Sequence, residues 1–322
     1  NLLQQIDYEK GTIFLDGKDY PLLDTNFPTI DPADPCRFTE QEADIMDRLA
    51  KAFMGCEKLQ KHMKFLLANG SLYKVYNNNL LYHGCVPLNE DGTLKEVEIY
   101  GRRYKGRALY DVLDNYVRKG FVAVDEEERE KGRDLMWYIW LSENSPLFGK
   151  DKMATFERYF LAEKETHREV KNPYYKFLEN EEVVDRILRE FGLEPEGAHI
   201  INGHVPVKSK DGESPIKCGG KLLIIDGGFS RAYQKETGIA GYTLIYNSYG
   251  LILAAHRPFE STEAAIENES DIHSDSTVVK WVARRKRVGD TDTGQELREK
   301  IKDLERLLEA YYSGAIAEKF TG

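Results

Sequence analysis

Two apolar segments that each end in a histidine beside a glycine constrain this chain more than any other feature. Residues 80–84 are an apolar run that ends in His83 and a glycine, and residues 200–204 are an apolar run that ends in a glycine and His204. Short apolar runs of this kind are typical of buried strands. A strand fixes the backbone at its end, and the missing side chain of glycine lets a metal or a phosphate approach. The pattern therefore favours ligand binding by His83 and His204.

Each of these histidines also has a structural interpretation. A single histidine at a strand end is more often a satisfied, partly buried side chain than a ligand, and motif matches carry a high false-positive risk. Neutral imidazole is, however, a common ligand of Mn, Zn and Fe. Two histidines in the same setting shift the balance toward ligation. His167, His199 and His256 lack the adjacent glycine and are interpreted as structural or surface residues.

A third apolar run, residues 222–225, ends in Asp226 followed by two glycines. Three roles are open to Asp226: direct ligation of a metal, acceptance of a hydrogen bond from a ligating histidine, or a place in a turn. Asp-Gly is a common turn dipeptide. The turn and the hydrogen-bonding role are favoured over direct ligation.

The charge balance limits the ligands that such a chain can bind. Of its 322 residues, 45 are Lys or Arg and 55 are Asp or Glu, which gives a net charge of −10. Nucleic acid is a poor match, because affinity for its backbone comes from Lys and Arg. Binding of a small phosphorylated molecule needs local positive charge, from a metal or from placed basic side chains. Arg158 and Lys150 are candidates, although packing of Arg158 on aromatic rings is an equal alternative.

The cysteines and the apolar runs indicate a cytoplasmic protein. The 4 cysteines form no C-x-x-C pair, which is typical of a reduced chain and not of a disulfide framework. No apolar run reaches the length needed to span a membrane. The chain begins with Asn1, so the natural polypeptide is expected to begin upstream. The length suggests about two domains' worth of chain, or one large domain.

Hydrophobic periodicity predicts a mixed α/β chain, of the α+β type. Thr39 and Glu42 form a capping box that starts a helix, and further helices are predicted over residues 107–119, with Gly120 as the stop, 126–142 and 180–192. The predicted strands cover residues 71–76, 80–83, 199–202, 222–225, 242–246 and 251–255. Residues 260–294 are acidic and poor in apolar side chains. A final amphipathic helix carries Leu297, Ile301, Leu304, Leu308 and Tyr311 on its apolar face.

The strand ends, taken together with longer strings, resemble a known family. His83-Gly84, residues 203–207 and residues 225–228, in that order, resemble the later motifs of the calcineurin-like metallophosphoesterases. Over nearly the whole chain, to about Phe259, the sequence is similar to the class III (bacterial) fructose-1,6-bisphosphatases. The strings that carry this similarity lie at residues 71–73, 83–87, 145–150, 155–160, 171–175 and 238–242.

The resemblance implies a fold, namely half of a β-sandwich of mixed sheets flanked by helices, with a C-terminal helical extension. Family chains are about twice as long, so the chain is expected to be the C-terminal half of such a protein. Its strands are then expected to form mostly one sheet, with an exposed apolar patch or a tight partner chain. Residues 1–70 would lead into the core, 71–262 would form half of the core, and 263–322 would form an acidic linker and a helix.

The resemblance also assigns roles to residues. His83 and His204 match two histidines that bind one metal of a dinuclear site, for which Mn²⁺ is the expected ion. The general-acid histidine and the bridging aspartate belong to upstream motifs that are absent here, so no catalytic residue is expected within this chain. Its only D-x-H string, residues 271–273, is interpreted as a coincidence on a solvated surface. Arg158 and Lys150 stay candidates for contacts with substrate phosphate.

The implied reaction is hydrolysis of the 1-phosphate of fructose 1,6-bisphosphate, a step of gluconeogenesis. Two divalent cations would hold the phosphate oxygens and lower the pKa of a bridging water. The expected partners are this substrate and the N-terminal half, without which the segment is expected to be inactive; a homo-oligomer is possible. Two alternatives stay open. One is another calcineurin-like phosphoesterase, acting on proteins or dinucleoside polyphosphates, and the other is a non-catalytic interaction domain.

Overall fold

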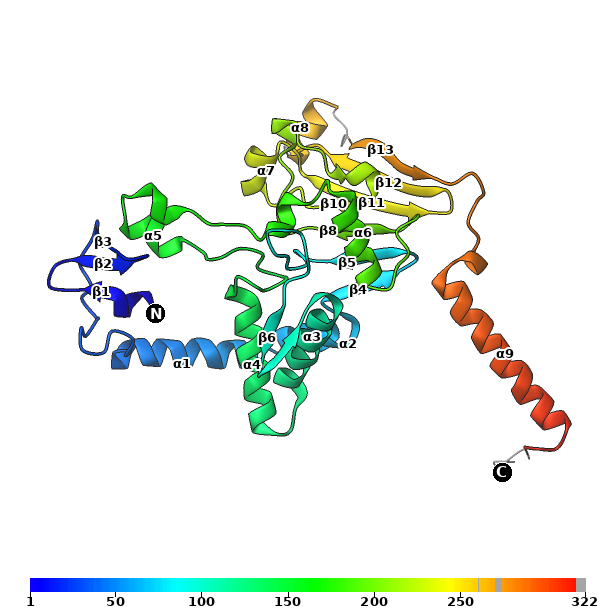
Figure 1. Cartoon of the computed structure of the whole chain (residues 1–322), viewed down its shortest axis with the longest axis horizontal. Helices are drawn as coiled ribbons and strands as arrows, with labels where there is room; N and C mark the ends of the chain where they lie inside the picture. The colour runs from blue at the N-terminus through cyan, green and yellow to red at the C-terminus, as the bar shows by residue number, and fades with distance from the viewer. Residues whose placement is uncertain (260, 270–273, 317–322) are drawn as a thin grey trace. The chain divides into compact units, whose positions relative to one another are not determined.

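The computed structural model describes residues 1–259, 261–269 and 274–316 (Figure 1). The chain divides into two compact units: unit 1 comprises Asn1–Leu72 and Lys95–Pro173, and unit 2 comprises Tyr73–Leu94 and Tyr174–Gly322. Each unit is therefore built from two separate stretches of sequence. The three-part division at residues 70 and 262 stays a prediction, and the D-x-H string at residues 271–273 lies outside the described residues.

Unit 1 combines small antiparallel sheets with helices. Its strands are β1 (Ile6–Asp7), β2 (Thr12–Leu15), β3 (Lys18–Pro21), β6 (Val97–Ile99) and β7 (Arg102–Tyr104). Its helices are α1 (Glu40–Gly55), α2 (Glu57–Asn69), α3 (Gly106–Val122), α4 (Glu126–Leu141) and α5 (Thr155–Phe160), with 3-10 turns η1 (Leu2–Gln5) and η2 (Lys164–His167). The turn η3 (Pro173–Lys176) follows where the chain passes into unit 2.

The capping box at the start of α1 is confirmed. The Thr39 hydroxyl accepts a hydrogen bond from the backbone N–H of Glu42 at 3.3 Å, and the Glu42 carboxylate accepts from the backbone N–H of Thr39 at 2.8 Å. None of the residues of α1 is buried, and its apolar residues are exposed. The apolar patch expected on the strand core is a different surface and stays a prediction.

Two glycines set the packing of α3 on α4. A β-carbon on Gly132 of α4 would lie 2.2 Å from the backbone nitrogen of Gly120 in α3, so neither position has room for a side chain. Leu109 and Leu113 of α3 are buried in one cluster with Leu135 of α4. The prediction that Gly120 stops the helix is wrong, because α3 continues to Val122 and the glycine serves the close approach of the two helices.

Unit 2 contains the strand ends that the sequence singled out. Its strands are β4 (Tyr73–Tyr76), β5 (Asn79–Tyr82), β8 (His199–Asn202), β9 (Ile216–Lys217), β10 (Leu222–Ile224), β11 (Gly241–Asn247), β12 (Gly250–His256) and β13 (Ser274–Trp281). Its helices are α6 (Glu181–Glu190), α7 (Arg231–Thr237), α8 (Thr262–Glu267) and α9 (Asp292–Tyr312), with 3-10 turns η4 (Ser209–Asp211), η5 (Cys218–Gly220) and η6 (Val288–Asp290).

A five-stranded mixed sheet positions these strand ends. Its order is β4-β5-β8-β10-β9, and the three central strands β5, β8 and β10 run parallel to one another. Ile200 of β8 pairs with Leu80 of β5 on one side and with Leu222 of β10 on the other. All three residues are fully buried. Because parallel strands end at the same edge, the residues that follow β5, β8 and β10 are brought together there.

A separate antiparallel sheet, β11-β12-β13, packs on the five-stranded sheet within unit 2 (Figure 1). Ile201 and Leu223 of the larger sheet form one buried cluster with Leu251 of β12, and Val279 of β13 packs against it. The mixed α/β class is therefore confirmed. The expectation that the strands form mostly one sheet is wrong, because the paired strands belong to several sheets.

The strand β13 lies in the stretch that the sequence indicated as an acidic linker. It pairs with β12 over seven residue pairs, from Gly250↔Trp281 to His256↔Ser274. Most of its side chains are exposed or half-buried, since it forms one edge of the sheet. Within the residues described, every helix is too short or too polar to cross a bilayer.

Candidate metal-binding site

The candidate site lies where the three parallel strands of unit 2 end. His83 directly follows β5, Gly203 and His204 follow β8, and Asp226 lies just beyond β10. Two backbone hydrogen bonds tie these ends together: the Gly203 N–H donates to the His83 carbonyl at 2.9 Å, and the Val207 N–H donates to the Asp226 carbonyl at 2.8 Å. The positions of the strand-end side chains are therefore fixed by the sheet itself.

The two imidazoles that the sequence singled out are in contact. The Nε2 atom of His83 lies 3.0 Å from the Nδ1 atom of His204, and the rings meet edge to face with their centroids 4.8 Å apart. His83 is exposed and His204 is half-buried, so the pair faces solvent. When no cation lies between them, one nitrogen must carry a proton for the other to accept. A bound cation would use both lone pairs instead.

The backbone at His204 is held in an unusual conformation. His204 has a φ of 71°, in the left-handed region that side chains other than glycine rarely adopt. Such a conformation costs about 1–2 kcal/mol. It persists because the neighbouring backbone is pinned to the adjacent strand ends, and strain of this kind concentrates at functional sites. The turn Gly203–His204 thus directs the imidazole toward His83 at a cost in stability.

Asn202 belongs to the site although the sequence reasoning did not single it out. It is 2% exposed, and its side-chain N–H donates to the Gly84 carbonyl at 2.8 Å. Its side-chain oxygen is buried without a hydrogen-bond partner among the described residues. A buried, unpartnered amide oxygen is costly. The available signal was a polar residue at the end of a run that is otherwise apolar.

Gly203 keeps a space open between the strand ends. A β-carbon built on it would lie 3.6 Å from the Cβ atom of Asp226 and 3.9 Å from its Oδ2 atom, which is ordinary van der Waals contact. A methyl group would therefore fit, but it would occupy the space beside the Asp226 carboxylate. The other Asp226 oxygen, Oδ1, accepts a hydrogen bond from the Gly228 N–H at 3.0 Å, which is the turn role that the sequence favoured.

The surroundings of His83 favour its neutral form. Partial loss of solvent around the ring, followed by the charge of His204, lowers the pKa of His83, and the Asp226 carboxylate opposes this shift. A metal binds the neutral imidazole through its lone pair, so a lowered pKa favours ligation at neutral pH. The electrostatics of the pair are thus compatible with a ligand role.

Cys85, two residues from His83, does not compete as a ligand. It is fully buried, and burial raises the pKa of its thiol to about 12. Metals bind the thiolate, which is not populated at neutral pH when the pKa lies so high. Nearby, the hydroxyls of Tyr82 and Tyr174 are hydrogen-bonded at 2.8 Å in the interior. This face of β5 is therefore core, and the ligand-binding groups lie at its end.

The geometry of the imidazole pair fits one cation but does not complete a site. Two nitrogen ligands at right angles, as in an octahedral site, and each about 2.1 Å from the cation lie about 3 Å apart, whereas in a tetrahedral site they lie about 3.4 Å apart. The separation of 3.0 Å between His83 Nε2 and His204 Nδ1 agrees with the right-angled arrangement. The described part of the chain holds no group of three or more His, Cys, Asp or Glu side chains arranged to hold a metal. Two ring nitrogens in contact do not by themselves make a complete metal site.

The two candidate phosphate contacts lie in unit 1 and share a carboxylate. Lys150 Nζ is 2.6 Å from Glu169 Oε2, and Arg158 Nη2 is 2.9 Å from Glu169 Oε1. The Glu169 side chain is 16% exposed. Its pKa is raised by burial, but the hydrogen bond from Lys150, the Ala154 N–H and the two cationic charges outweigh burial and lower it. Both cations thus have a partner inside the chain, and their contact with substrate stays a prediction.

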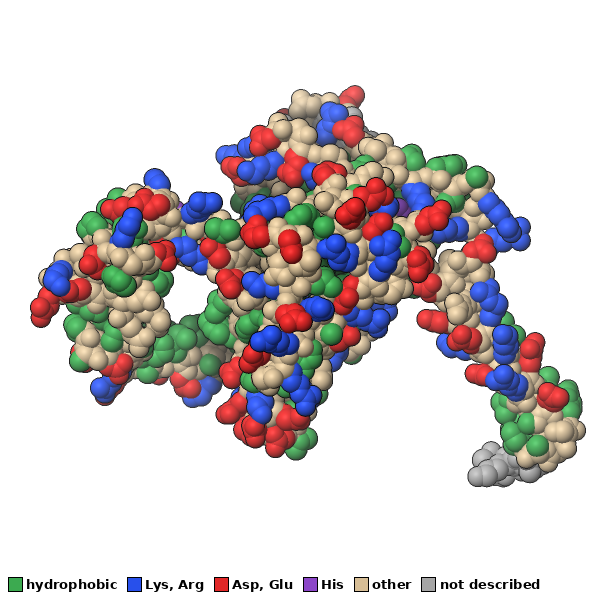
Figure 2. All heavy atoms as spheres, viewed as in Figure 1, with side chains coloured by type: hydrophobic (Ala, Val, Ile, Leu, Met, Phe, Trp, Pro, Cys, Tyr) green, Lys and Arg blue, Asp and Glu red, His purple; other side chains and the backbone are tan. Residues whose placement is uncertain are grey.

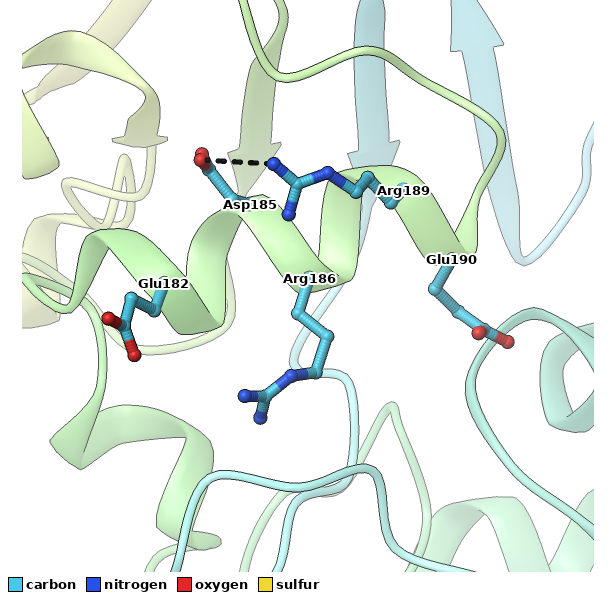
Figure 3. A pocket seen from close by; sticks show the side chains of 5 residues that line it. All are labelled: Glu182, Asp185, Arg186, Arg189 and Glu190. Carbon is cyan, nitrogen blue, oxygen red and sulfur yellow. Dashed lines mark ion pairs between the residues drawn. The ribbon is translucent and has the colours of Figure 1, made fainter.

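A surface cavity of about 540 Å³ lies along α6, and its side chains do not point to a particular ligand (Figure 3). Its lining carries both signs of charge, and Asp185 is 3.7 Å from Arg189. Arg186 donates to the Gly92 carbonyl at 2.7 Å. Acidic and basic side chains are likewise interspersed over the face drawn in Figure 2. The imidazole pair therefore remains the feature of unit 2 that most favours a ligand.

The sequence matches a protein-family model and several curated proteins. Residues 1–313 match the model described as Firmicute fructose-1,6-bisphosphatase. A protein of Clostridium novyi (strain NT) is 56% identical over 319 residues, which is 99% of this chain and 48% of that protein. Proteins of Clostridium botulinum (strain Langeland) and Alkaliphilus metalliredigens (strain QYMF) are each 55% identical, over 319 and 321 residues, with the same coverage of 99% and 48%.

All three relatives carry the name fructose-1,6-bisphosphatase class 3. The chain spans about half the length of the curated relatives that it matches. No solved structure matches the chain.

Proposed function

The chain belongs to the Firmicute fructose-1,6-bisphosphatase family, and from this premise we propose that it forms part of a phosphatase that removes the 1-phosphate of fructose 1,6-bisphosphate. The observation that carries the proposal is the contact between His83 and His204, which lie 121 positions apart in the chain. Two separate strand ends converge there on one point. The names of the relatives support the choice of substrate.

We propose that His83 Nε2 and His204 Nδ1 bind one divalent cation of a dinuclear site, with Mn²⁺ as the expected ion. Bound divalent cations supply Lewis acidity and a water of lowered pKa to phosphate hydrolysis. The lowered pKa of His83 keeps its lone pair available. Asp226, whose charge acts on His83, would orient the pair electrostatically.

The remaining ligands and the proton donor are proposed to lie outside these 322 residues. Two nitrogens do not make a complete site, and the chain spans about half of its relatives' length. The described side chains of this chain would then hold and orient the cation without moving a proton to the leaving group. On this proposal the chain alone binds metal weakly and turns over little substrate.

An activity assay tests the proposal. Phosphate release from fructose 1,6-bisphosphate would be measured with Mn²⁺ for the chain alone, for a protein of the full length of its relatives, and for that protein with a chelator. We expect activity from the longer protein only, and we expect the chelator to abolish it.

Two results would overturn parts of the proposal. Robust turnover by the chain alone would show that its own residues complete the site. Preferential hydrolysis of phosphoproteins or dinucleoside polyphosphates by the longer protein would favour another calcineurin-like phosphoesterase, and no hydrolysis of any substrate would favour a non-catalytic domain.

A further inference from the structure

The last helix of the described chain carries an apolar stripe that nothing covers. In α9, Gly294 alone is buried among the described residues, and the other apolar side chains are largely exposed. Leu304 is 63% exposed and Ile301 is 53% exposed. Figure 2 shows apolar side chains at the surface of this helix, beside charged ones. Most of the stability of a helix in a protein comes from packing of its apolar face, so an uncovered face on a helix of 21 residues calls for a partner.

The spacing of the stripe specifies the kind of partner. The apolar positions recur in alternating steps of four and three: Leu297, Ile301, Leu304, Leu308 and Tyr311. Written as a heptad, these residues occupy the a and d positions, which form the seam of a coiled coil, and the apolar surface beside the seam is extended by Leu307 at a g position and Tyr312 at an e position. In a parallel pair of helices Leu307 of one copy would face Tyr312 of the other. The b, c and f positions, on the opposite side, are polar or small: Gln295, Glu296, Glu299, Lys302, Asp303, Arg306, Glu309, Ala310 and Ser313.

The residues that flank the seam are complementary to a second copy of the same helix. Lys300 occupies a g position, and Glu305 occupies the e position five residues later. In a parallel pair of helices, g of one helix faces e of the other, so Lys300 of each copy would face Glu305 of its partner. Neither residue forms an ion pair within the described part of the chain. The two charges are therefore available to a partner helix.

The start of α9 favours the parallel orientation over the antiparallel one. An antiparallel pair would set Arg298 against Glu305, and Arg298 would have to leave or share its present contact, in which Nη1 donates to the Gly289 carbonyl at 2.5 Å. Isoleucine at a and leucine at d, as at Ile301 and Leu304, favour two parallel strands. The first turn is also tied down within unit 2, because the Asp292 carboxylate accepts from the Asn77 N–H at 2.7 Å. The first turn of α9 is thus held in place against unit 2 by this hydrogen bond.

We propose that α9 pairs in parallel with α9 of a second copy of this chain, as a two-stranded coiled coil through Leu297, Ile301, Leu304, Leu308 and Tyr311. The seam lies in an element separate from the imidazole pair. Its test therefore needs no activity measurement, and its failure would leave the proposed function untouched.

Sedimentation of the chain measures the association. One copy has a mass of 37.0 kDa, and we expect the wild-type chain to sediment with twice that mass at micromolar concentration. Leu304→Asp puts a charge into the seam and should return the chain to one copy. Gln295→Asp adds the same charge on the opposite side and should leave the doubled mass unchanged. A wild-type chain of single mass, or a doubled mass that survives Leu304→Asp, would overturn the proposal.

Disulfide crosslinking tests the orientation. In a chain with Cys36, Cys56 and Cys218 replaced by Ser, Leu304→Cys places two thiols opposite one another at d positions of a parallel pair. We expect mild oxidation to give a covalent dimer. Lys302→Cys, at an outward b position, should give none. A dimer by sedimentation that crosslinks through position 302 and not through 304 would contradict the parallel seam.

Discussion

The imidazole pair of unit 2 and the Glu169 cluster of unit 1 both gather side chains that could bind phosphate or metal, but they differ in the kind of contact that holds them. Lys150 and Arg158 each meet one oxygen of Glu169, at 2.6 and 2.9 Å, so both cations already have an anionic partner within the chain. His83 and His204 present two ring nitrogens to each other at 3.0 Å, on a backbone held at a φ of 71°.

The difference indicates which of the two clusters is the better candidate for a ligand-binding site. A cation that already pairs with a carboxylate gains less from a ligand, because the ligand would have to displace or share that partner. The two imidazoles face solvent and would gain contacts from a cation, and the left-handed backbone at His204 brings them together at a cost in strain. Ligand binding is therefore expected at the strand ends of unit 2 before it is expected at Glu169.

The largest effect is expected from His204→Gly. Glycine accepts the left-handed backbone without strain, so this variant removes the imidazole while the fold should gain about 1 kcal/mol of stability. In a protein of the relatives' full length, we expect phosphatase activity to fall by at least about 100-fold. Thermal unfolding and turnover would be measured together. A stable His204→Gly variant that keeps its activity would show that His204 does not bind the catalytic metal.

The next largest effect is expected from substitution of two glycines at the strand ends, Gly227 and Gly203. A β-carbon on Gly227 would lie 2.6 Å from the Cα atom of Gly241, so Gly227→Ala should destabilise the fold by about 1–3 kcal/mol. Gly203→Ala meets only ordinary contacts and should leave the free energy of unfolding within about 0.5 kcal/mol.

Urea denaturation of both glycine variants measures this contrast. Because the methyl group at position 203 occupies space beside Asp226, we also expect Gly203→Ala to weaken Mn²⁺ binding in a titration. Equal stability losses in the two variants would show that Gly203 serves packing and not access.

Removal of Glu169 tests whether the carboxylate of the unit 1 cluster serves stability and not substrate binding. Glu169→Ala leaves Lys150 and the Ala154 N–H without their acceptor and should cost about 1–2 kcal/mol of unfolding free energy. Glu165→Ala, at an exposed position on the same segment, should cost less than about 0.5 kcal/mol. We expect the KM of the longer protein for its substrate to stay unchanged. A lower KM in Glu169→Ala would show that the released cations contact phosphate.

The smallest expected effect is a change in the folding stability at acidic pH. The pKa of Glu169 is lowered in the folded state, since the contacts from Lys150, the Ala154 N–H and Arg158 together exceed the opposing effect of burial. A group with a depressed folded pKa stabilises the fold above its unfolded pKa of about 4.3 and loses that contribution as pH falls through the folded value. The stability difference between wild type and Glu169→Ala should therefore be constant from pH 7 to about pH 5 and shrink below it. A difference that grows in acid would contradict the ion pairs.

Local rules in the sequence were sufficient where the structure is local. The helix cap at Thr39 depends on side chains three residues apart, and the hairpin of β11 and β12 depends on the turn between them, so both could be predicted. The strand β13 could not, because its polar, exposed side chains are typical of a sheet edge and hide the alternation expected of a strand. Gly120 was misread since its neighbour, Gly132, comes from another helix.

The candidate site likewise has features that the sequence could predict and features that it could not. His83 and His204 could be singled out because a histidine beside a glycine after an apolar run is visible in the sequence. Their contact followed from a family resemblance and not from spacing. The buried amide of Asn202 and the left-handed backbone of His204 could not be predicted, because both depend on how β5, β8 and β10 align. Register between distant strands is a property of the folded sheet.

Anomalous X-ray scattering at the manganese edge, from crystals of the chain grown with saturating Mn²⁺, tests most directly whether the two imidazoles hold one cation. We expect a peak within about 2.2 Å of both His83 Nε2 and His204 Nδ1, and we expect it to vanish in His204→Gly. Manganese bound elsewhere, with the two ring nitrogens still hydrogen-bonded to each other, would contradict the metal site and remove the physical support for the proposed phosphatase.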